Sequence, residues 1–252
     1  MAIAHDGHPP ALVLDAGTGL RLLPGLLDGG PFVGTILLGH LHWDHTQGLP
    51  FCPSIDRDDA SVRLLLPAQG ERAEHLLARA MSPPHFPIRP DQLRGAWSFE
   101  NLDAGWHDIE QFRVLTAEIP HKGGRTFGLR VEDGTSAIAY LSDHAPQELG
   151  PGPDGWGDYH AAARALAGGV DLLIHDAQYT IEELPVRGPF GHAAADYAVG
   201  LAAHAGARRV LLYHHDPSRT DHEVDELVAA VASRHADVAV EAARQGMVLD
   251  VG

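Results

Sequence analysis

The six residues HLHWDH, at positions 40–45, constrain the fold and the chemistry of this chain more than any other stretch. They follow an apolar run at residues 35–38 and precede turn-forming residues at 48–50. A short apolar run bounded by turn residues indicates a buried strand. Alternate residues of an extended segment share a face, so the first two histidines of the motif point the same way. Once the chain turns, the aspartate and the last histidine can face the same point from the other side.

Three imidazoles and one carboxylate that converge on a point predict a metal site. The donors of His40, His42, Asp44 and His45 suit zinc, manganese or iron, and the lack of a thiolate disfavours a closed structural zinc site. A histidine-rich surface loop is the alternative interpretation. The strand that precedes the motif favours the metal site over that loop.

Composition narrows the class of protein. At 252 residues, 44% of them hydrophobic, the chain can build one α/β domain or two small ones. Its formal charge of −16 repels phosphate backbones and argues against an extended nucleic-acid surface or an anionic membrane surface. The single cysteine, Cys52, excludes an internal disulfide and fits a reducing compartment. No apolar run approaches the ~18–20 residues of a membrane span, so we expect a soluble, cytoplasmic protein.

Apolar runs alternate with turn residues along the chain and predict both strands and helices. Residues 82–90 (SPPHFPIRP) hold four prolines and cannot form regular structure. This stiff loop carries His85 and Phe86, which form either a lip over the site that contacts substrate or an ordinary surface connection. No internal repeat or linker is visible, so we expect a single domain over residues 1–252, with two sheets and helices outside them. The expected strands are residues 11–16, 35–38, 62–66, 112–119, 126–131, 137–141, 170–174, 210–213, 238–241 and 247–251, and the expected helices are residues 20–27, 71–81, 159–167, 193–205 and 221–233.

Further metal ligands are expected where strands of the second half end, because α/β folds keep their chemistry in the loops at strand ends. His121 ends one such strand, and Asp143 ends the next but one. His175 and His214 end two later strands.

These residues, in this order, resemble the metallo-β-lactamase superfamily, and within it the ribonuclease Z-like phosphodiesterase branch. The resemblance covers about residues 12–217, most of the chain. The stretches that carry it are LDAGTG (14–19), LGHLHWDHTQGLP (38–50), IPHKGGRTFGLRV (119–131), LSD (141–143), LIHDAQYT (173–180), GHAAADYA (191–198) and LLYHHDP (211–217).

The resemblance implies a four-layer αββα sandwich, the metallo-β-lactamase fold, with a dinuclear site. It implies two divalent metal ions, zinc first, with manganese or iron as alternatives. Antibiotic-hydrolysing members commonly carry a cysteine at the bridging position, so β-lactam hydrolysis is not expected here. Carried over by position, one metal is held by His40, His42 and His121, the other by Asp44, His45 and His214, and Asp143 bridges them.

The implied activity is hydrolysis of a phosphodiester. Two metals about 3.5–4 Å apart can share a hydroxide and stabilise both the attacking and the leaving oxygen of an in-line displacement, and Asp44 would orient that hydroxide. The resemblance makes His192 the general acid for the leaving oxygen; the alternative is a helix-start histidine packed against Asp176 or solvent. Asp15, His175 and Asp176 either orient imidazoles or are ordinary polar groups at strand ends.

The substrate is expected to be small, such as a cyclic nucleotide. Ribonuclease Z proper carries a long tRNA-gripping insertion, usually between the lone histidine and the bridging aspartate, but only 22 positions separate His121 from Asp143. tRNA 3′ processing is therefore disfavoured. Lactone or thioester hydrolysis on the same ligands is an alternative, weakened by the sequence HKGG where those enzymes commonly show an HTPG-type turn. A non-catalytic metal-binding module is a further alternative.

The start of the chain departs from the resembling proteins. Only ten residues precede Ala11, and no strand is expected among them. Either the first strand of the fold is missing or the assigned start is internal. An open sheet edge would result, which could pair with a second copy in a homodimer.

Overall fold

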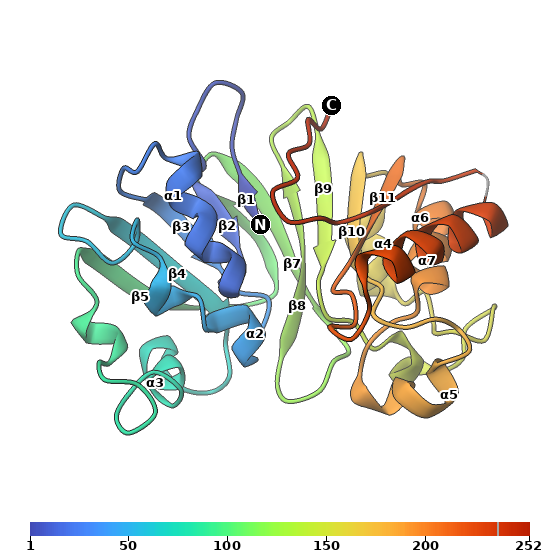
Figure 1. Cartoon of the computed structure of the whole chain (residues 1–252), viewed down its shortest axis with the longest axis horizontal. Helices are drawn as coiled ribbons and strands as arrows, with labels where there is room; N and C mark the ends of the chain where they lie inside the picture. The colour runs from blue at the N-terminus through green and yellow to red at the C-terminus, as the bar shows by residue number, and fades with distance from the viewer. Residues whose placement is uncertain (236) are drawn as a thin grey trace. The chain divides into compact units, whose positions relative to one another are not determined.

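The computed structural model describes residues 1–235 and 237–252, which form two compact units. The N-terminal unit comprises residues 1–103 and 109–111, and the C-terminal unit comprises residues 104–108 and 112–252. Each unit contains one β-sheet with its own helices (Figure 1). The expected mixed α/β architecture with two sheets is therefore confirmed, whereas a single domain over the whole chain stays a prediction.

The sheet of the N-terminal unit has the strand order β1-β2-β3-β4-β5. Neighbouring strands from β2 to β5 are parallel, and β1 is antiparallel to β2. Parallel strands covered on both faces read as continuous apolar runs, which is why the second to fourth strands were visible in the sequence. The strands are β1 (Ala2–Ile3), β2 (Leu12–Leu14), β3 (Val33–Leu37), β4 (Ser61–Pro67) and β5 (Ala96–Leu102).

Short helical segments cover this sheet. The helices are α1 (Leu23–Leu26), α2 (Trp43–Thr46) and α3 (Ala73–Ala78), with 3₁₀ turns at Thr18–Leu22, Leu49–Phe51 and Pro90–Gln92. Leu23 and Leu77 from the helices pack in one cluster with Ile36 and Leu64 from the strands. This core fixes the end of β3, from which the HLHWDH loop departs.

The C-terminal unit has a seven-stranded sheet in the order β12-β11-β10-β9-β8-β7-β6. The pairs β7–β8 and β8–β9 are antiparallel, whereas β9–β10, β10–β11 and β11–β12 are parallel. The strands are β6 (Gly105–Ile109), β7 (Phe112–Ile119), β8 (Thr126–Glu132), β9 (Ala137–Leu141), β10 (Leu172–Asp176), β11 (Arg209–Tyr213) and β12 (Ala239–Ala242).

Longer helices pack on this second sheet, as the C-terminal unit in Figure 1 shows. They are α4 (Ala161–Ala167), α6 (Ala195–Ala205) and α7 (Asp221–Arg234); the short helix α5 (Leu184–Arg187) and the 3₁₀ turns at Pro146–Leu149 and Gly188–Phe190 belong to the connecting segments. Leu166, Leu201 and Val231 from three helices join Leu173 and Leu212 from the strands in one buried cluster. Among the helices of the described residues, none is long and apolar enough to cross a membrane.

Four segments differ from expectation. Ala2 and Ile3 pair with Leu12 and Val13 as β1, where no strand was expected; the segment is too short for its pattern to stand out. Residues 247–251 form no strand, because their apolar residues have no paired neighbour, and Val248 is 80% exposed. Strands β5 and β6 were not expected, because most of their residues are exposed or half-buried and neither segment carries a continuous apolar run.

Candidate metal centre

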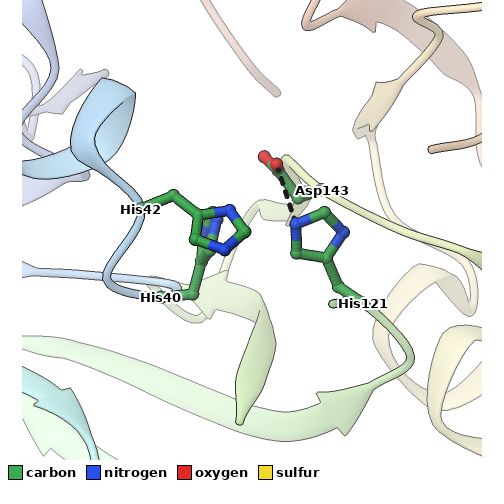
Figure 2. Close-up of side chains that lie close together, drawn as sticks. All are labelled: His40, His42, His121 and Asp143. Atoms are coloured by element: carbon green, nitrogen blue, oxygen red, sulfur yellow. Dashed lines mark ion pairs between the residues drawn. The ribbon is translucent and has the colours of Figure 1, made fainter. Parts of the chain in front are cut away.

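The HLHWDH loop begins one residue after Gly39, close to the end of β3. Its first two histidines have ring centroids 4.5 Å apart (Figure 2). His42 is extended and is the N-cap of α2, so the chain turns there. The turn brings His45 back, with its ring centroid 4.2 Å from that of His40 and its Nε2 3.1 Å from Oδ2 of Asp44. The N-terminal unit therefore brings these four side chains close together, and their role as metal ligands stays a prediction.

Asp15 holds His45 from behind. The Oδ2 atom of this buried carboxylate lies 2.7 Å from Nδ1 of His45, and its Oδ1 accepts the Gly39 N–H at 2.7 Å. A proton on Nδ1 leaves the Nε2 lone pair for a metal. Burial acts to raise the pKa of Asp15, but the charge and hydrogen bond of His45 outweigh it and lower the pKa below its ordinary value. Asp15 thus has the orienting contact expected of it.

The LDAGTG stretch packs against the HLHWDH loop through main-chain contacts. Ala16 N–H donates to the His45 carbonyl, and Gly48 N–H donates to the Ala16 carbonyl, each at 2.8 Å. A Cβ at Gly17 would collide with the main-chain oxygen of Asp44. Only glycine therefore allows the two segments to approach this closely.

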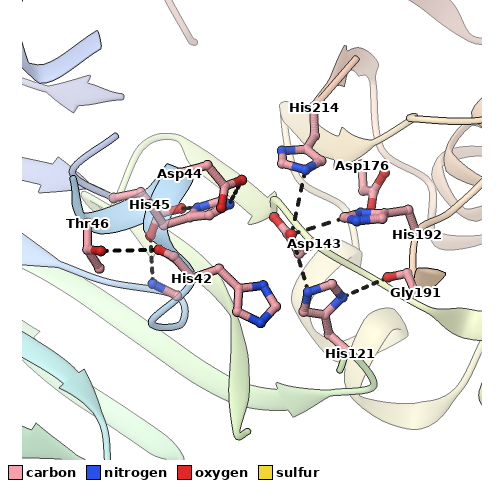
Figure 3. A network of polar contacts seen from close by, with 12 residues as sticks. His42, Asp44, His45, Thr46, His121, Asp143, Asp176, Gly191, His192 and His214 are labelled. Carbon is pink, nitrogen blue, oxygen red and sulfur yellow. Dashed lines mark hydrogen bonds and ion pairs between the residues drawn. The ribbon is translucent and has the colours of Figure 1, made fainter. Parts of the chain in front are cut away.

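The C-terminal unit groups His121, Asp143 and His214. Nε2 of His121 lies 3.4 Å from Oδ2 of Asp143, and Nε2 of His214 lies 3.6 Å from the same oxygen (Figures 2 and 3). Nδ1 of His121 lies 2.7 Å from the Gly191 carbonyl oxygen. Because a carbonyl only accepts, Nδ1 donates this hydrogen bond, and Nε2 faces Asp143. His214 has a left-handed backbone with φ of 53°, which is uncommon for histidine and typical of functional sites.

His192 lies beside this group. Its Nδ1 is 2.9 Å from Oδ2 of Asp176 and 3.9 Å from Oδ2 of Asp143, and its ring stacks on that of His214 at 4.9 Å (Figure 3). Asp176 is fully buried and also accepts the main-chain N–H of Gln178 at 3.0 Å. This contact between His192 and Asp176 is expected if His192 is only a packed helix-start histidine, and it is equally expected if Asp176 orients His192 as a general acid.

Two cationic side chains fasten the segment that precedes His192. Lys122, next to His121, donates from Nζ to the main-chain oxygen of Pro189. Arg187 forms an ion pair with Asp216. The backbone that leads into His192 is therefore held at two points.

The remaining predicted residues lie apart from these donors. His175 forms hydrogen bonds with His144 and with the Asp176 carbonyl, and neither of these two partners is a predicted metal ligand. Phe86 packs edge-on against Phe51 at 5.8 Å, and His85 is exposed.

Sequence reasoning left out His144, which follows Asp143 and is fully buried, and it did not single out His160, its hydrogen-bond partner. No sequence spacing identifies this pair, because the contact depends on how the start of α4 packs.

The donor chemistry of the seven side chains fits a divalent metal. All offer imidazole nitrogen or carboxylate oxygen, the set preferred by zinc, manganese and iron in catalytic sites. Cys52, a potential soft ligand, is buried in the hydrophobic core of the N-terminal unit. These residues thus provide a His/Asp cluster that could bind metal, and how the ligands divide between ions stays a prediction.

Comparisons with known proteins identify the relatives of this chain. The family described as "Beta-lactamase superfamily domain" matches residues 11–215. A ribonuclease Z from Salinibacter ruber is 26% identical, and the match covers 96% of this chain and 87% of the relative.

Two solved structures share the fold over 98% of this chain. The metallo-beta-lactamase fold protein YhfI from Bacillus subtilis has a TM-score of 0.69 and 16% identity, with 89% of that chain covered. A diphosphatase from the PhnP family has a TM-score of 0.66 and 17% identity, with 81% of that chain covered. The family match and these relatives indicate a metal-dependent hydrolase.

Proposed function

Because the chain belongs to the beta-lactamase superfamily domain family, we propose that it is a dinuclear metal-dependent phosphodiesterase acting on a small substrate such as a cyclic nucleotide. The observation that carries the proposal is the donor set itself. Seven imidazole and carboxylate side chains are grouped as potential metal ligands, with Asp143 and no thiolate in the set. Hard oxygen and borderline nitrogen donors suit ions that neutralise charge on phosphate oxygens.

Each proposed ion has a histidine-rich set of ligands. Zinc is the first expectation, with manganese or iron as alternatives, because the same donors accept several divalent ions. When bound, such a pair supplies a water activated at neutral pH and positive charge for the phosphate oxygens. We assign His40, His42 and His121 to one ion, Asp44, His45 and His214 to the other, and Asp143 to both.

The protein's own side chains would orient and protonate the reactants. Asp44, whose side chain is 54% exposed, can accept a hydrogen bond from the attacking water and aim it. His192 donates through Nδ1 to Asp176 and therefore presents Nε2 to the leaving oxygen. Asp176 fixes this tautomer and stabilises the imidazolium before its proton leaves.

A small phosphodiester is favoured by the form of the chain and by its relatives. The segment between His121 and Asp143 holds only strands β8 and β9 with their short connections, which leaves no room for a tRNA-binding arm. The net charge of −16 disfavours a long polyanion. The names of two relatives, a ribonuclease and a diphosphatase, both denote cleavage at phosphorus.

A substrate panel tests the proposal. Protein loaded with zinc or manganese, its metal content measured by elemental analysis, is given bis-p-nitrophenyl phosphate, 2′,3′-cyclic and 3′,5′-cyclic nucleotides, a homoserine lactone and a thioester. Turnover should be fastest with a phosphodiester. Faster turnover of the lactone or the thioester would overturn the choice of substrate, and two bound ions without any turnover would favour a binding module.

RNA is the second candidate substrate, because the ribonuclease Z relative aligns over nearly the whole chain. A precursor tRNA with a 3′ trailer therefore belongs in the panel. Cleavage of this RNA more efficiently than of any small phosphodiester would replace the small-substrate proposal. A cytoplasmic location, supported by the single Cys52, and a homodimer remain predictions.

A further inference from the structure

Three imidazoles in the C-terminal unit form a hydrogen-bonded chain, here called the imidazole chain, that takes no part in the mechanism above. Nε2 of His160 lies 2.8 Å from Nε2 of His144, and Nδ1 of His144 lies 2.9 Å from Nε2 of His175. Nδ1 of His175 lies 2.7 Å from the main-chain oxygen of Asp176. The three residues come from the start of α4, the end of β9 and the end of β10.

The last contact fixes the direction of every hydrogen bond in the chain. A carbonyl oxygen only accepts, so His175 must carry its proton on Nδ1 and accept at Nε2. His144 must then donate from Nδ1, and as a neutral imidazole it accepts at Nε2. His160 therefore donates from Nε2. The geometry allows one set of neutral tautomers, with all the contacts satisfied.

The surroundings hold this arrangement rigid. His144 and His175 are fully buried, and the buried ring of Tyr197 packs against both, with centroids 5.5 Å from each. Tyr197 belongs to α6, the helix that follows His192. His160 is the N-cap residue of α4, yet its side chain makes no capping hydrogen bond there. The imidazole is committed to His144 instead.

The imidazole chain ends at Asp176, which also contacts the proposed general acid. The main-chain oxygen of Asp176 accepts a hydrogen bond from His175. Its Oδ2 accepts hydrogen bonds from Nδ1 of His192 and, at 3.0 Å, from the main-chain N–H of His144. His144 also follows the proposed bridging ligand Asp143. One hydrogen-bonded chain thus connects α4 to the backbone of both Asp143 and Asp176.

We propose that His160, His144 and His175 are positioning residues that hold Asp176, and through it His192, in line for proton transfer to the leaving group. The inference rests on the proposed function, because it assigns these residues to the general-acid step of that reaction. Their effect should appear only where the leaving oxygen needs a proton, since a good leaving group departs unassisted.

The imidazole tautomers give a test that needs no activity. In ¹⁵N-imidazole NMR spectra of the intact protein at pH 8, His144 and His175 should carry the proton on Nδ1 and His160 on Nε2. Spectra of the His160→Gln and His175→Asn variants assign the signals. A proton on Nε2 of His144 would contradict the deduced direction and overturn the proposal.

Kinetics of His160 variants then separate positioning from general support of the fold. His160→Leu removes the donor, whereas the amide nitrogen of His160→Gln can replace Nε2 as a donor at the same length. With an alkyl phosphodiester, His160→Leu should lower kcat by roughly 10-fold with little change in KM, and His160→Gln should restore it. With bis-p-nitrophenyl phosphate all variants should match the wild type within about 2-fold.

His222→Leu is the matched control, because His222 is 81% exposed in the same unit and forms its ion pair with the exposed Glu226. An equal loss of kcat on both substrates, or no loss on either, would show that the imidazole chain does not position the acid. That result would overturn this inference but not the proposed function. A wild-type protein inactive on every phosphodiester would overturn the proposed function, and the positioning role with it.

Discussion

Three imidazoles at the candidate centre are oriented in the same way, each through an oxygen acceptor at Nδ1. Asp15 accepts from His45, the Gly191 carbonyl accepts from His121, and Asp176 accepts from His192. In each case Nε2 becomes the working nitrogen. The carboxylates differ from the carbonyl in that they also stabilise a positive charge on the ring, which a proton donor such as His192 requires.

Exchange of the Asp15 carboxylate for an amide should weaken metal binding without disturbing the fold. Asn tolerates the left-handed backbone of Asp15, which has φ of 59°. Its amide nitrogen would face Nδ1 of His45 as a donor, which shifts the imidazole proton to Nε2 and removes the ligand lone pair. Asp15→Asn should lower metal affinity by about 10–100-fold, measured by competition with a chromophoric chelator.

The control for this change is Asp28→Asn, since Asp28 also has a left-handed backbone, with φ of 48°. Metal affinity in that variant should equal the wild type. An Asp15→Asn protein with unaltered affinity would show that Asp15 only supports the backbone of Gly39.

Removal of the proposed general acid should separate chemistry from metal binding. His192→Ala should lower kcat by roughly 10²–10⁴-fold on substrates with poor leaving groups, while elemental analysis finds the same metal content. His222→Ala, a change at an exposed site of the same unit, should leave kcat unaltered. Equal turnover in the His192→Ala protein would remove the catalytic role and leave the packing against Asp176 as its function.

At the scale of elements, the close contact between the LDAGTG turn and the metal loop depends on the lack of a side chain at Gly17. A Cβ at Gly17 would meet the Asp44 main-chain oxygen, whereas a Cβ at Gly19 would meet nothing within 4 Å. Gly17→Ala must therefore push the two segments apart, at a cost of about 1–3 kcal/mol.

The matched pair Gly17→Ala and Gly19→Ala tests this contact. The first variant should lower Tm by several degrees, because each kcal/mol is worth about 2–4 °C in a chain of this size, and should also bind metal less tightly. The second should match the wild type in both calorimetry and metal titration. Similar behaviour of the two proteins would show that the turn can yield without moving the loop.

The predictable elements were those with a strong local pattern. β7 was expected at residues 112–119 and occupies Phe112–Ile119, because apolar and polar residues alternate along much of it and turn residues follow it. β5 was missed, since it is an edge strand whose exposed and half-buried residues look like a loop. Residues 247–251 carry apolar residues but no partner strand, a fact of tertiary structure that a local pattern does not contain.

The candidate site divides along the same line. The donors of the HLHWDH loop follow from strand alternation and a turn, and the contact of Asp15 with His45 follows from two adjacent parallel strands, β2 and β3. The His160–His144 contact was not predictable, because it needs α4 to dock with its first turn against the end of β9.

For the whole molecule, buried neutral histidines predict a loss of stability in mild acid. Burial lowers the pKa of both His175 and His160 below the ordinary value of 6.5. The unfolded chain therefore binds protons near pH 6.5 that the folded chain does not, so stability is fully present above pH 6.5 and falls as the pH drops below it.

Thermal unfolding of the metal-free protein between pH 5 and pH 8 measures this dependence. The His160→Gln variant lacks one of the histidines whose pKa is lowered, and its Tm should fall less steeply below pH 6.5 than that of the wild type. Asp15 does not interfere, since its pKa lies below its ordinary 3.8. Parallel curves for the two proteins would show that His160 titrates normally in the folded state.

The bond between Lys122 and Pro189 has a practical consequence for anyone who handles this protein. Lys122 is the sole lysine of the sequence, and the residue is exposed. Among side chains, amine-directed reagents such as fluorescent esters, aldehyde fixatives and activated resins will therefore react mainly with Lys122. This lysine contacts Pro189, three residues before His192 in the sequence. A dye attached to Lys122 would be placed to report on movement of the segment around Pro189, and a resin coupled there would tether the protein next to the candidate site.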